Sequence, residues 1–413
     1  MNILFAAHGY KPAFRIGGPI ISIARLAEHL VRRGHKVVVF TSNSNLDEDL
    51  DVPINQPVMV DGVEVWYFQY RDPIKKYFPF IPYFSQTAGY FYLPELKRIL
   101  AQRIREFDIV HTHVPLVYPT YAVAKKAIKH GIPVIYHQRG TFSPAYLRYR
   151  SLKKRIYISL FEKPIMKNAA LLVALTRAEV DSYRGLGVNT PCCIIPNGVD
   201  VSDYLQKYRG ELYLNAKDVI TPDNFVILFL ARLHVIKGAD FLIDVFLQVF
   251  KYYPKARLVM AGPDQQNLKE TLLSKVKAAG ALSRVFMPGM VTGKLKRDLL
   301  ARSDLFCQPS LAEGFSVGIL EAMASATPVM ATPQCNFPEI ESASAGWVVE
   351  KDLEKWVDKI AVLLKQSSQA QTNGVNAINL VKRQYTWEAI VDQLEDAYVV
   401  GLKETSKGLK KRW

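Results

Sequence analysis

Two acidic residues, Glu313 and Glu321, stand eight positions apart around a glycine and a serine. We expect a turn led by Gly314 to open into a helix at about Ser316, which would leave unpaired backbone N–H groups at the positive end of the helix dipole. Such groups suit a phosphate or a hydroxyl-rich ligand, and the two acids would hold different parts of one elongated molecule, for example a nucleotide-sugar. An ordinary loop and amphipathic helix with two solvated acids explains the segment equally well, because acid pairs at this spacing are common.

Two cations follow the most apolar strand predicted in the second half of the chain. Arg232 comes directly after the run at residues 225–231, and Lys237 with Gly238 follows shortly before a predicted helix. Two cations near a helix N-terminus suit a diphosphate leaving group. Taken as an isolated pair, the two side chains are more typical of surface charges.

These residues must be positioned by alternating strands and helices, because short β-rich runs alternate with helical patterns along the whole chain. That rhythm is typical of parallel sheets of the α/β class. The predicted strands are residues 2–7, 36–40, 109–113, 133–137, 171–175, 225–230, 257–261, 285–287, 305–308, 328–331 and 347–349. Ligands of such folds bind at the carboxyl ends of the strands, where the strand order reverses.

The length of the chain predicts two domains, since 413 residues exceed the size at which one hydrophobic core stops growing. A sharp turn signal, Pro196–Gly198, lies between the two sets of strands, so we place the boundary near residue 200. Hydrophobic residues make up 49% of the chain and charged residues 22%, which indicates a globular protein. Two doubly wound domains of similar size would then meet at a cleft.

Composition also excludes several classes of protein. No apolar run is longer than the seven residues of 225–231, whereas a membrane-spanning helix needs roughly 20. The first seven residues carry no basic residue before their apolar part, and they predict a strand instead of a signal peptide. Four cysteines without a Cys-x-x-Cys pair argue against structural zinc and a disulfide framework, which favours the cytoplasm.

Positive charge is concentrated in the first half of the chain. Residues 1–200 contain 26 Lys and Arg against 15 Asp and Glu, residues 201–406 contain 23 of each, and the last seven residues add four basic ones. A basic first half indicates an anionic partner, such as a membrane surface, a nucleic acid or an acidic substrate. For any single lysine cluster, a merely solvated face is the simpler explanation.

One aromatic segment breaks the alternation of strands and helices. Residues 75–84 combine two lysines, five aromatics and two prolines, and 90–92 add three more aromatics. The proline spacing argues against a strand or helix over 78–82. Exposed, the segment would anchor the protein at an anionic membrane surface; folded inward, it would be a lid or wall of an acceptor cleft, or plain core.

Taken together, these segments resemble the retaining glycosyltransferases of family 4, and the resemblance covers nearly the whole chain. The motifs that carry it are Gly17-Gly18, His111–His113, His137–Gly140, Thr176–Glu179, Pro196–Asp200, Arg232 with Lys237-Gly238, Ala261–Pro263, Pro309–Phe315, Glu321–Met323 and Thr327–Val329. The resemblance implies an α/β fold of the GT-B type, with two Rossmann-like domains facing across a cleft and a C-terminal helix crossing back to the first. It implies an acceptor-side domain over 1–200, a nucleotide-sugar donor domain over 201–385, and a crossover helix with a basic tail over 386–413.

The resemblance also assigns roles on the phosphate side of the donor. Gly17 and Gly18 would lie in the first strand-to-helix loop, where missing side chains let the backbone approach the diphosphate. Arg232 and Lys237 would neutralise the departing nucleoside diphosphate in place of a divalent metal, so that neither a metal nor another cofactor is required. Glu321 would bind the ribose.

On the sugar side, the resemblance implies that Glu313 hydrogen-bonds the donor hydroxyls. The backbone beside it, Gly314, Phe315, Ser316 and Val317, would complete the donor site with its N–H groups. His113 would face the donor sugar from the first domain. The competing interpretation is a metal pair of His111 and His113; because side chains alternate between the faces of a strand, we expect the two imidazoles to point apart and assign His111 a structural role.

Three departures from the family pattern bear on the donor. Ala231 stands where glycine is usual, residues 333–337 replace a frequent glycine pair, and residues inserted beside the usual His-Gly leave Arg139 without a clear role.

Our first hypothesis is a metal-independent retaining hexosyltransferase that uses a nucleotide-sugar at the cytoplasmic membrane face. It would extend a glycan or lipid-linked acceptor in polysaccharide or glycolipid synthesis, without nucleic acid as a partner. The alternatives are a nucleotide-sugar epimerase of the same architecture and a non-enzymatic basic adaptor on an anionic membrane surface.

Overall fold

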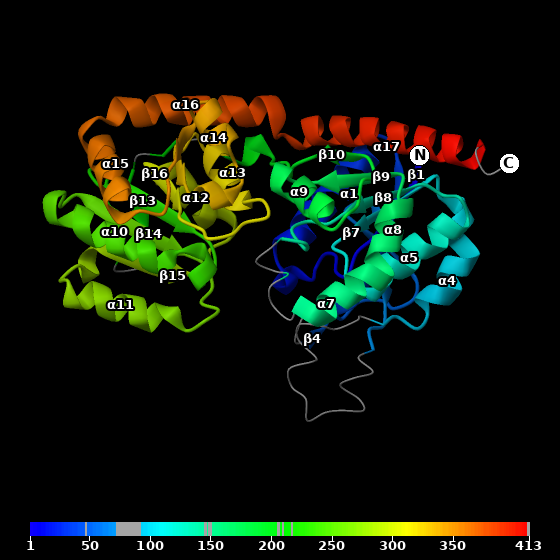
Figure 1. Cartoon of the computed structure of the whole chain (residues 1–413). Helices are drawn as coiled ribbons and strands as arrows, with labels where there is room; N and C mark the ends of the chain where they lie inside the picture. The colour runs from blue at the N-terminus through cyan, green and yellow to red at the C-terminus, as the bar shows by residue number, and fades with distance from the viewer. Residues whose placement is uncertain are drawn as a thin grey trace. The chain divides into compact units, whose positions relative to one another are not determined.

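The computed structural model describes residues 1–45, 48–71, 92–143, 147, 151–204, 207–208, 210–215 and 218–410. The chain divides into two compact units (Figure 1). Unit 1 consists of Met1–Asn197 together with Trp387–Trp413, and unit 2 of Gly198–Thr386. The aromatic segment at 75–84 and residues 90–91 lie outside the described residues.

Unit 1 is built on an eight-stranded sheet with the order β10-β9-β8-β7-β1-β2-β6-β5. All neighbours pair in parallel except β5 and β6, which form an antiparallel hairpin. Its strands are β1 Asn2–Ala6, β2 Lys36–Ser42, β5 Pro57–Val60, β6 Val63–Phe68, β7 Ile109–His113, β8 Val134–His137, β9 Leu171–Ala174 and β10 Cys192–Ile194; β3 Ser44–Asn45 and β4 Glu48–Asp49 form a small separate ladder. The chain proceeds from β1 to β2 and β6 on one side and from β7 to β10 on the other, so the strand order reverses between β1 and β7.

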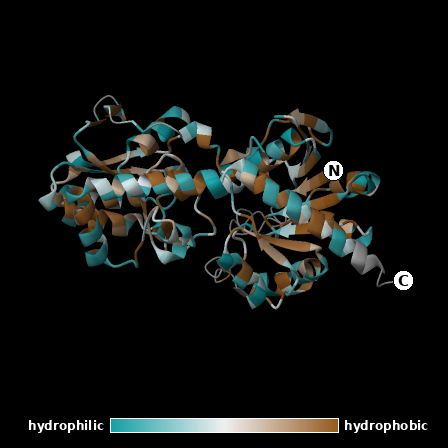
Figure 2. Ribbon diagram, turned by 90° about the horizontal axis from the view of Figure 1, so that it is seen from above, coloured by the Kyte–Doolittle hydropathy of each residue, from teal (hydrophilic) through white to brown (hydrophobic). Residues whose placement is uncertain are grey.

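Helices cover both faces of this sheet, and alternate strand residues enter two separate cores. Leu4, Val38 and Val110 belong to the core beneath α4, α5, α8 and α9, whereas Ile3, Val37 and Ile109 belong to the core beneath α1 and α17. Figure 2 shows the strands as predominantly hydrophobic. The helical elements of unit 1 are η1 Phe14–Ile16, α1 Gly18–Arg32, α4 Leu96–Arg103, η2 Ile104–Glu106, α5 Tyr118–Lys129, α7 Ser151–Tyr157, the π-helical turn η3 Ile158–Glu162, α8 Lys163–Asn168, α9 Arg177–Gly185 and α17 Trp387–Lys410.

The last helix, α17, returns to unit 1 after the chain has completed unit 2. Its buried residues Trp387, Ile390 and Leu394 join the core beneath α1, and His35 Nε2 lies 2.7 Å from the carboxylate of Glu395. The predicted crossover helix is therefore confirmed. The apolar face of α17 explains this docking, because an amphipathic helix is stabilised mainly by burial of that face.

Unit 2 contains a six-stranded parallel sheet with the order β15-β14-β13-β16-β17-β18. Its strands are β13 Phe225–Leu230, β14 Ala256–Ala261, β15 Val285–Gly289, β16 Leu305–Gln308, β17 Val329–Ala331 and β18 Gly346–Val348; β11 Leu212–Tyr213 and β12 Val219–Ile220 form a small hairpin. Here the strand order reverses between β13 and β16, which are hydrogen-bonded neighbours. A ligand site is expected at the carboxyl ends of these two strands.

The faces of the second sheet are also covered by helices. One core lies beneath α12, α13 and α16 and the other beneath α10, α11 and α15, with Val226 and Leu228 entering the first and Ile227 and Phe229 the second. The helical elements of unit 2 are η4 Val201–Tyr204, η5 Val235–Lys237, α10 Ala239–Tyr252, α11 Leu268–Ala278, η6 Leu282–Arg284, α12 Gly293–Arg302, α13 Val317–Ala324, η7 Pro333–Cys335, α14 Glu339–Ser342, α15 Leu353–Lys365 and α16 Ser367–Gln384. The predicted class, α/β with two Rossmann-like domains, is confirmed by both sheets.

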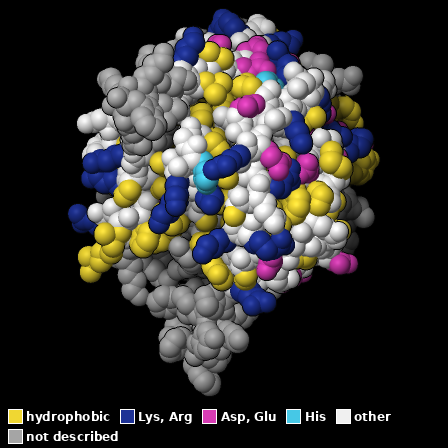
Figure 3. Space-filling view, turned by 90° about the vertical axis from the view of Figure 1, so that its right-hand side faces the viewer, with side chains coloured by type: hydrophobic (Ala, Val, Ile, Leu, Met, Phe, Trp, Pro, Cys, Tyr) yellow, Lys and Arg dark blue, Asp and Glu magenta, His cyan; other side chains and the backbone are white. Residues whose placement is uncertain are grey.

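Charged and hydrophobic side chains are both exposed on the surface of the molecule (Figure 3). On the face drawn in Figure 3, Lys and Arg side chains gather among hydrophobic ones. None of the helices among the described residues is long and apolar enough to cross a membrane.

Candidate active site

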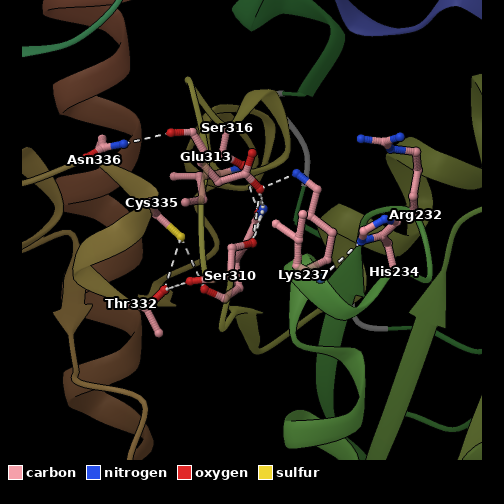
Figure 4. A network of polar contacts seen from close by, with 12 residues as sticks. Arg232, His234, Lys237, Ser310, Glu313, Ser316, Thr332, Cys335 and Asn336 are labelled. Carbon is pink, nitrogen blue, oxygen red and sulfur yellow. Dashed lines mark hydrogen bonds and ion pairs between the residues drawn. The ribbon is translucent and has the colours of Figure 1, made fainter. Parts of the chain in front are cut away.

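The carboxyl ends of β13 and β16 bring together two residues that the sequence places 76 positions apart. Lys237 Nζ donates to Glu313 Oε1 at 2.5 Å, and the two side chains are 16% and 8% exposed. Figure 4 shows the lysine and the carboxylate pointing toward each other from opposite sides of the site. A cation and an anion thus meet at the point where the strand order reverses.

Lys237 is held there by a tight connection between β13 and α10. Gly238 has φ +73°, and a Cβ at this position would lie 2.2 Å from the backbone oxygen of Pro309. Only glycine permits this close approach, so η5 can pack directly against the segment that follows β16. The backbone N–H of Leu311 donates to the carbonyl of Ile236 at 2.7 Å, which fixes the two segments side by side.

Glu313 is fixed by neighbours from β16 and from the segment after β17. Its Oε1 atom also accepts from Gln308 Nε2 at 2.5 Å and from Ser310 Oγ at 3.0 Å, and its backbone carbonyl accepts from Asn336 Nδ2 at 2.7 Å. Three donors on one oxygen hold the carboxylate in a single orientation. No motif in the sequence pointed to Gln308, Ser310 or Asn336 as partners of this acid, because their proximity depends on the order of the strands.

The predicted helix after Glu313 begins where expected. Ser316 is the N-cap of α13: its Oγ accepts from the backbone N–H of Ile319 at 3.2 Å and donates to Gln308 Oε1 at 2.8 Å. Gln308 thereby links Glu313 to the start of the helix. Phe315 turns toward Phe337, with ring centroids 5.3 Å apart, so Gly314, Phe315 and Val317 contribute backbone at this edge of the sheet.

Glu321 and Arg232 lie outside this network, although the sequence motifs predicted both as part of the same donor site. Glu321 Oε1 accepts from Lys296 Nζ at 2.6 Å and from Tyr204 Oη at 3.1 Å. Arg232 is exposed, and its guanidinium donates to Gln265 Oε1 at 2.6 Å. The structure therefore brings Lys237, Glu313 and Ser316 into one network, whereas Arg232 and Glu321 have partners of their own; sequence reasoning missed Lys296 entirely.

Gly17 and Gly18 lie at the start of α1, in the loop that follows β1 of unit 1. Gly17 is the N-cap residue with φ +115°, and Gly18 opens the helix. A Cβ built at either position meets nothing within 4 Å. The space in front of these backbone atoms is thus open to a ligand, and at Gly17 the backbone conformation itself favours glycine.

His113, at the end of β7, is fully buried and packs edge-on against Phe5 at 4.6 Å between ring centroids. Its Nδ1 atom accepts from Arg139 Nε at 3.2 Å. Since Nδ1 is an acceptor, the proton of the neutral ring must be on Nε2, which makes Nε2 a donor. Nε2 has no hydrogen-bond partner among the described residues.

Our expectation that His111 and His113 point apart is wrong. Residues two positions apart on a strand share a face, and the two rings lie 4.0 Å apart, with His137 at 5.7 Å from each. The three imidazoles bring one ligand atom each within 4.8 Å of one another. His111 also contacts Tyr398 Oη at 2.8 Å, in keeping with a structural role.

Despite this geometry, the charges around the three histidines do not favour a metal ion. The Arg139 guanidinium contacts His113 directly, and a second buried cation beside it would be repelled. Arg139 also donates to Ser22 Oγ at 3.0 Å and to Asn197 Oδ1 at 2.9 Å. Arg139, to which the sequence assigned no clear role, therefore orients His113 and ties the segment after β8 to α1 and to Asn197, where the first segment of unit 1 ends.

Removal of Arg139 is expected to change the titration of His113. Burial, and after it the charges of His111 and Arg139, hold the pKa of His113 well below 6.5. In the Arg139→Met variant one of these charges is gone, so the pKa of His113 is expected to rise. Two-dimensional NMR of the imidazole nitrogens, assigned with His113→Gln, would measure this. An unchanged titration, with no shift of the proton between ring nitrogens, would contradict the assigned contact.

Acidification is expected to destabilise the protein through its buried imidazoles. Burial lowers the pKa of His8 to about 4 and those of His111, His113 and His137 well below 6.5. The unfolded chain, in which each pKa is near 6.5, binds more protons below that pH. The contribution of these histidines to the free energy of unfolding is therefore complete above about pH 6.5. It falls as the pH decreases, by up to about 1.4 kcal/mol per pH unit for each histidine.

Two buried carboxyls oppose this dependence without cancelling it. Burial raises the pKa of Glu179 to about 7 and that of Glu162 above its usual value, so each favours folding at lower pH; four imidazoles outweigh two acids. Urea midpoints followed by circular dichroism at pH 5.5 and 7.5 would measure the balance. We expect a lower midpoint at the acidic pH and a smaller difference in His111→Asn; equal midpoints would contradict the prediction.

Two families of protein sequences match the chain. The family described as Glycosyltransferase Family 4 matches residues 16–203, and the family described as Glycosyl transferases group 1 matches residues 224–366. The two matches fall on the two halves of the chain and include Gly17, His113, Lys237, Glu313 and Glu321.

Similar proteins occur among eukaryotes and archaea. A phosphatidylinositol N-acetylglucosaminyltransferase subunit from Arabidopsis thaliana is 25% identical over all of this chain and 85% of its own length, and its namesake from Homo sapiens is 24% identical over 96% of this chain and 75% of its own. An uncharacterized glycosyltransferase of Methanocaldococcus jannaschii is 24% identical over 98% of this chain and 99% of its own length.

Solved structures share the fold. HepE of Anabaena, in complex with UDP and glucose, matches with a TM-score of 0.70 at 19% identity, over 96% of this chain and 99% of its own. Sucrose-phosphate synthase of Thermosynechococcus elongatus matches with a TM-score of 0.70 at 18% identity, over 96% of this chain and 98% of its own. The sequence families, the relatives and the two Rossmann-like units agree, and the chain belongs to the glycosyltransferases of family 4, with the GT-B fold.

Proposed function

We propose that this glycosyltransferase moves a hexose or N-acetylhexosamine from a nucleotide-sugar to a hydroxyl group of a glycan or lipid-linked acceptor. We propose further that it does so with retention of configuration and without a metal. The observation that carries the proposal is the Lys237–Glu313 pair at the carboxyl ends of β13 and β16. A cation for the leaving diphosphate and a carboxylate for sugar hydroxyls then stand side by side.

Each part of the donor has a counterpart among the residues of unit 2. Lys237 neutralises the developing charge on the departing diphosphate, and the exposed Arg232 swings from Gln265 to assist it. Glu313, oriented by Gln308 and Ser310, accepts hydrogen bonds from the sugar hydroxyls. Glu321, in the second turn of α13 and paired with Lys296 of α12, binds the ribose.

The reaction requires positioning more than covalent chemistry. The bond between the anomeric carbon and the diphosphate oxygen breaks as the acceptor oxygen bonds to the same face of that carbon. The acceptor proton passes to an oxygen of the leaving phosphate, so no protein nucleophile is consumed. From unit 1, Gly17 and Gly18 give the diphosphate access to the start of α1, and His113 helps to hold the reacting carbon in place.

The comparisons support a uridine nucleotide and a polar-lipid acceptor. HepE of Anabaena binds UDP-glucose, and the relatives include transferases named for phosphatidylinositol and for D-inositol 3-phosphate. An acceptor with a hydroxylated ring and a phosphate would suit the basic first half of this chain. We place the enzyme at the cytoplasmic face of a membrane, as a peripheral protein that needs no nucleic acid partner.

Two other functions make different predictions. A nucleotide-sugar epimerase of the same architecture would interconvert two sugars and form no glycoside from donor plus acceptor. A basic adaptor would bind anionic lipid without turning over any donor. The presence of Arg232, Lys237, Glu313 and Glu321 together favours the transferase, because an adaptor has no need of this set.

The proposal can be tested with a panel of nucleotide-sugars in the presence of EDTA. Binding and slow hydrolysis of each donor would be measured for wild type, Glu313→Ala and Lys237→Ala. We expect one uridine-linked donor to be engaged by wild type, to be lost in both variants and to be indifferent to EDTA. Epimerised sugar in place of released nucleotide, or dependence on added Mg²⁺, would contradict the proposal.

A further inference from the structure

Three large apolar side chains of unit 1 project into solvent along one helical segment. Leu152 is 71% exposed, Ile156 51% and Leu160 64%. They lie four residues apart along the helical run formed by α7 and η3, so they fall on one side of it. We refer to these three residues as the α7–η3 stripe.

The opposite side of the same run is committed to the core. Ile158 is buried, and Phe161 packs edge-on against Tyr121 of α5 with centroids 5.5 Å apart. The carboxylate of Glu162 accepts from the backbone N–H of Leu116 at 2.8 Å and from Tyr136 Oη at 2.7 Å. These contacts fix which side of the run faces outward, so the stripe cannot turn inward by rotation of the helix.

The part of the chain that carries the stripe is rich in basic residues. Residues 151–168 contain five Lys and Arg and a single acid, Glu162, whose carboxylate is buried. Arg155 is exposed next to Ile156. Lys125 is exposed on the neighbouring helix α5, where its Nζ lies 3.1 Å from Tyr121 Oη. The exposed side chains of this run and of the neighbouring helix α5 therefore include both apolar residues and cations.

We propose that the α7–η3 stripe inserts into the headgroup region of an anionic lipid bilayer, with Arg155 and Lys125 against the lipid phosphates. An apolar line flanked by cations, with no exposed acid on the described part of the run, is the pattern of helices that lie in a membrane interface. A protein partner would also cover apolar side chains, but it would not require the excess of basic residues. This inference rests on the proposed location at a membrane but not on the sugar transfer, because it concerns a surface that takes no part in donor binding.

Sedimentation with lipid vesicles tests the proposal. The vesicles contain phosphatidylcholine alone or mixed with phosphatidylglycerol, and the test variant is Leu152→Gln/Ile156→Gln/Leu160→Gln. The matched control removes exposed apolar side chains from unit 2, in Tyr252→Gln/Met290→Gln/Val375→Gln. A third variant, Leu152→Met/Ile156→Val/Leu160→Met, keeps the stripe apolar.

We expect wild type to bind the anionic vesicles, and the polar stripe variant to bind at least about tenfold more weakly. The control and the apolar variant should bind like wild type. Replacing Arg155 and Lys125 with Gln should cost about fivefold per charge and remove most of the salt dependence. Thermal unfolding of each variant would separate lost binding from lost structure.

Two outcomes would overturn the proposal: wild type that binds neither vesicle, or a folded polar stripe variant that binds like wild type. Self-association that disappears in the stripe variant, measured by light scattering without lipid, would assign the stripe to a contact between copies of the chain instead. Donor hydrolysis in solution would be recorded on the same samples. It should be equal in wild type and the stripe variant, so a failed membrane surface and a failed transferase remain distinguishable.

Discussion

The Lys237→Ala variant is expected to lose about 10³-fold in kcat, the largest effect of any single substitution in this protein. Lys237 is the cation nearest to Glu313, and its Nζ is held at the edge where the strand order reverses. Charge develops on the diphosphate as its bond to the sugar breaks, and a fixed cation in a half-buried site stabilises that charge strongly. Because the effect arises in the transition state, kcat should fall more than the affinity for donor.

The control for this prediction is Lys277→Ala, which removes an exposed lysine from α11 of the same unit. It should leave turnover within about twofold of wild type, because exposed charges contribute little. Lys237→Arg keeps the charge but cannot reproduce the compact contact with Glu313, so it should recover part of the activity. Equal kcat in wild type and Lys237→Ala would remove Lys237 from the mechanism.

The second large effect is expected for Glu313→Gln, with a loss of about 10² to 10³ in kcat/KM. The amide has nearly the same shape, but it no longer pairs with Lys237 or accepts strong hydrogen bonds from sugar hydroxyls. Gln308 and Ser310, which donate to Glu313 in the present structure, would retain their positions. The measurement is initial-rate kinetics with the donor found in the panel.

Glu341→Gln, an exposed acid on α14, is the matched control and should be nearly neutral. A double variant, Lys237→Ala/Glu313→Ala, should lose little more than Lys237→Ala alone, because the two side chains act on each other. Losses that multiply fully in the double variant would show that the two residues act independently. That result would contradict the paired site.

Much of the fold could be predicted from the sequence because most of its central strands are short β-rich runs that alternate with helical patterns. The strands Ile109–His113, Phe225–Leu230 and Leu305–Gln308 lie where the patterns placed them. The β5–β6 hairpin was missed, although Asp61-Gly62 between its strands is a typical hairpin turn. Its first strand is a short edge strand with Pro57 and Met59 exposed, and Glu64 interrupts the second, but residues 65–68 form an apolar run, so this hairpin was available from the sequence.

The candidate site was only partly accessible from the sequence. The motifs named Lys237 and Glu313, but their contact joins positions far apart, and it follows from the pairing of β13 with β16. Gln308 and Lys296 have no motif and act only through neighbours that the fold supplies. The error about His111 and His113 has a different origin, because residues two apart on a strand share a face, and this was available from the sequence.

The measurement that tests the central claim most directly is the anomeric configuration of a product formed without metal. Wild type would be incubated with its nucleotide-sugar, EDTA and glycerol as a small acceptor, and the glycoside analysed by ¹H NMR. We predict a glycoside with the same anomeric configuration as the donor, formed at an undiminished rate in EDTA and absent with Lys237→Ala. An inverted product, or a product formed only after Mg²⁺ or Mn²⁺ is added, would contradict the account.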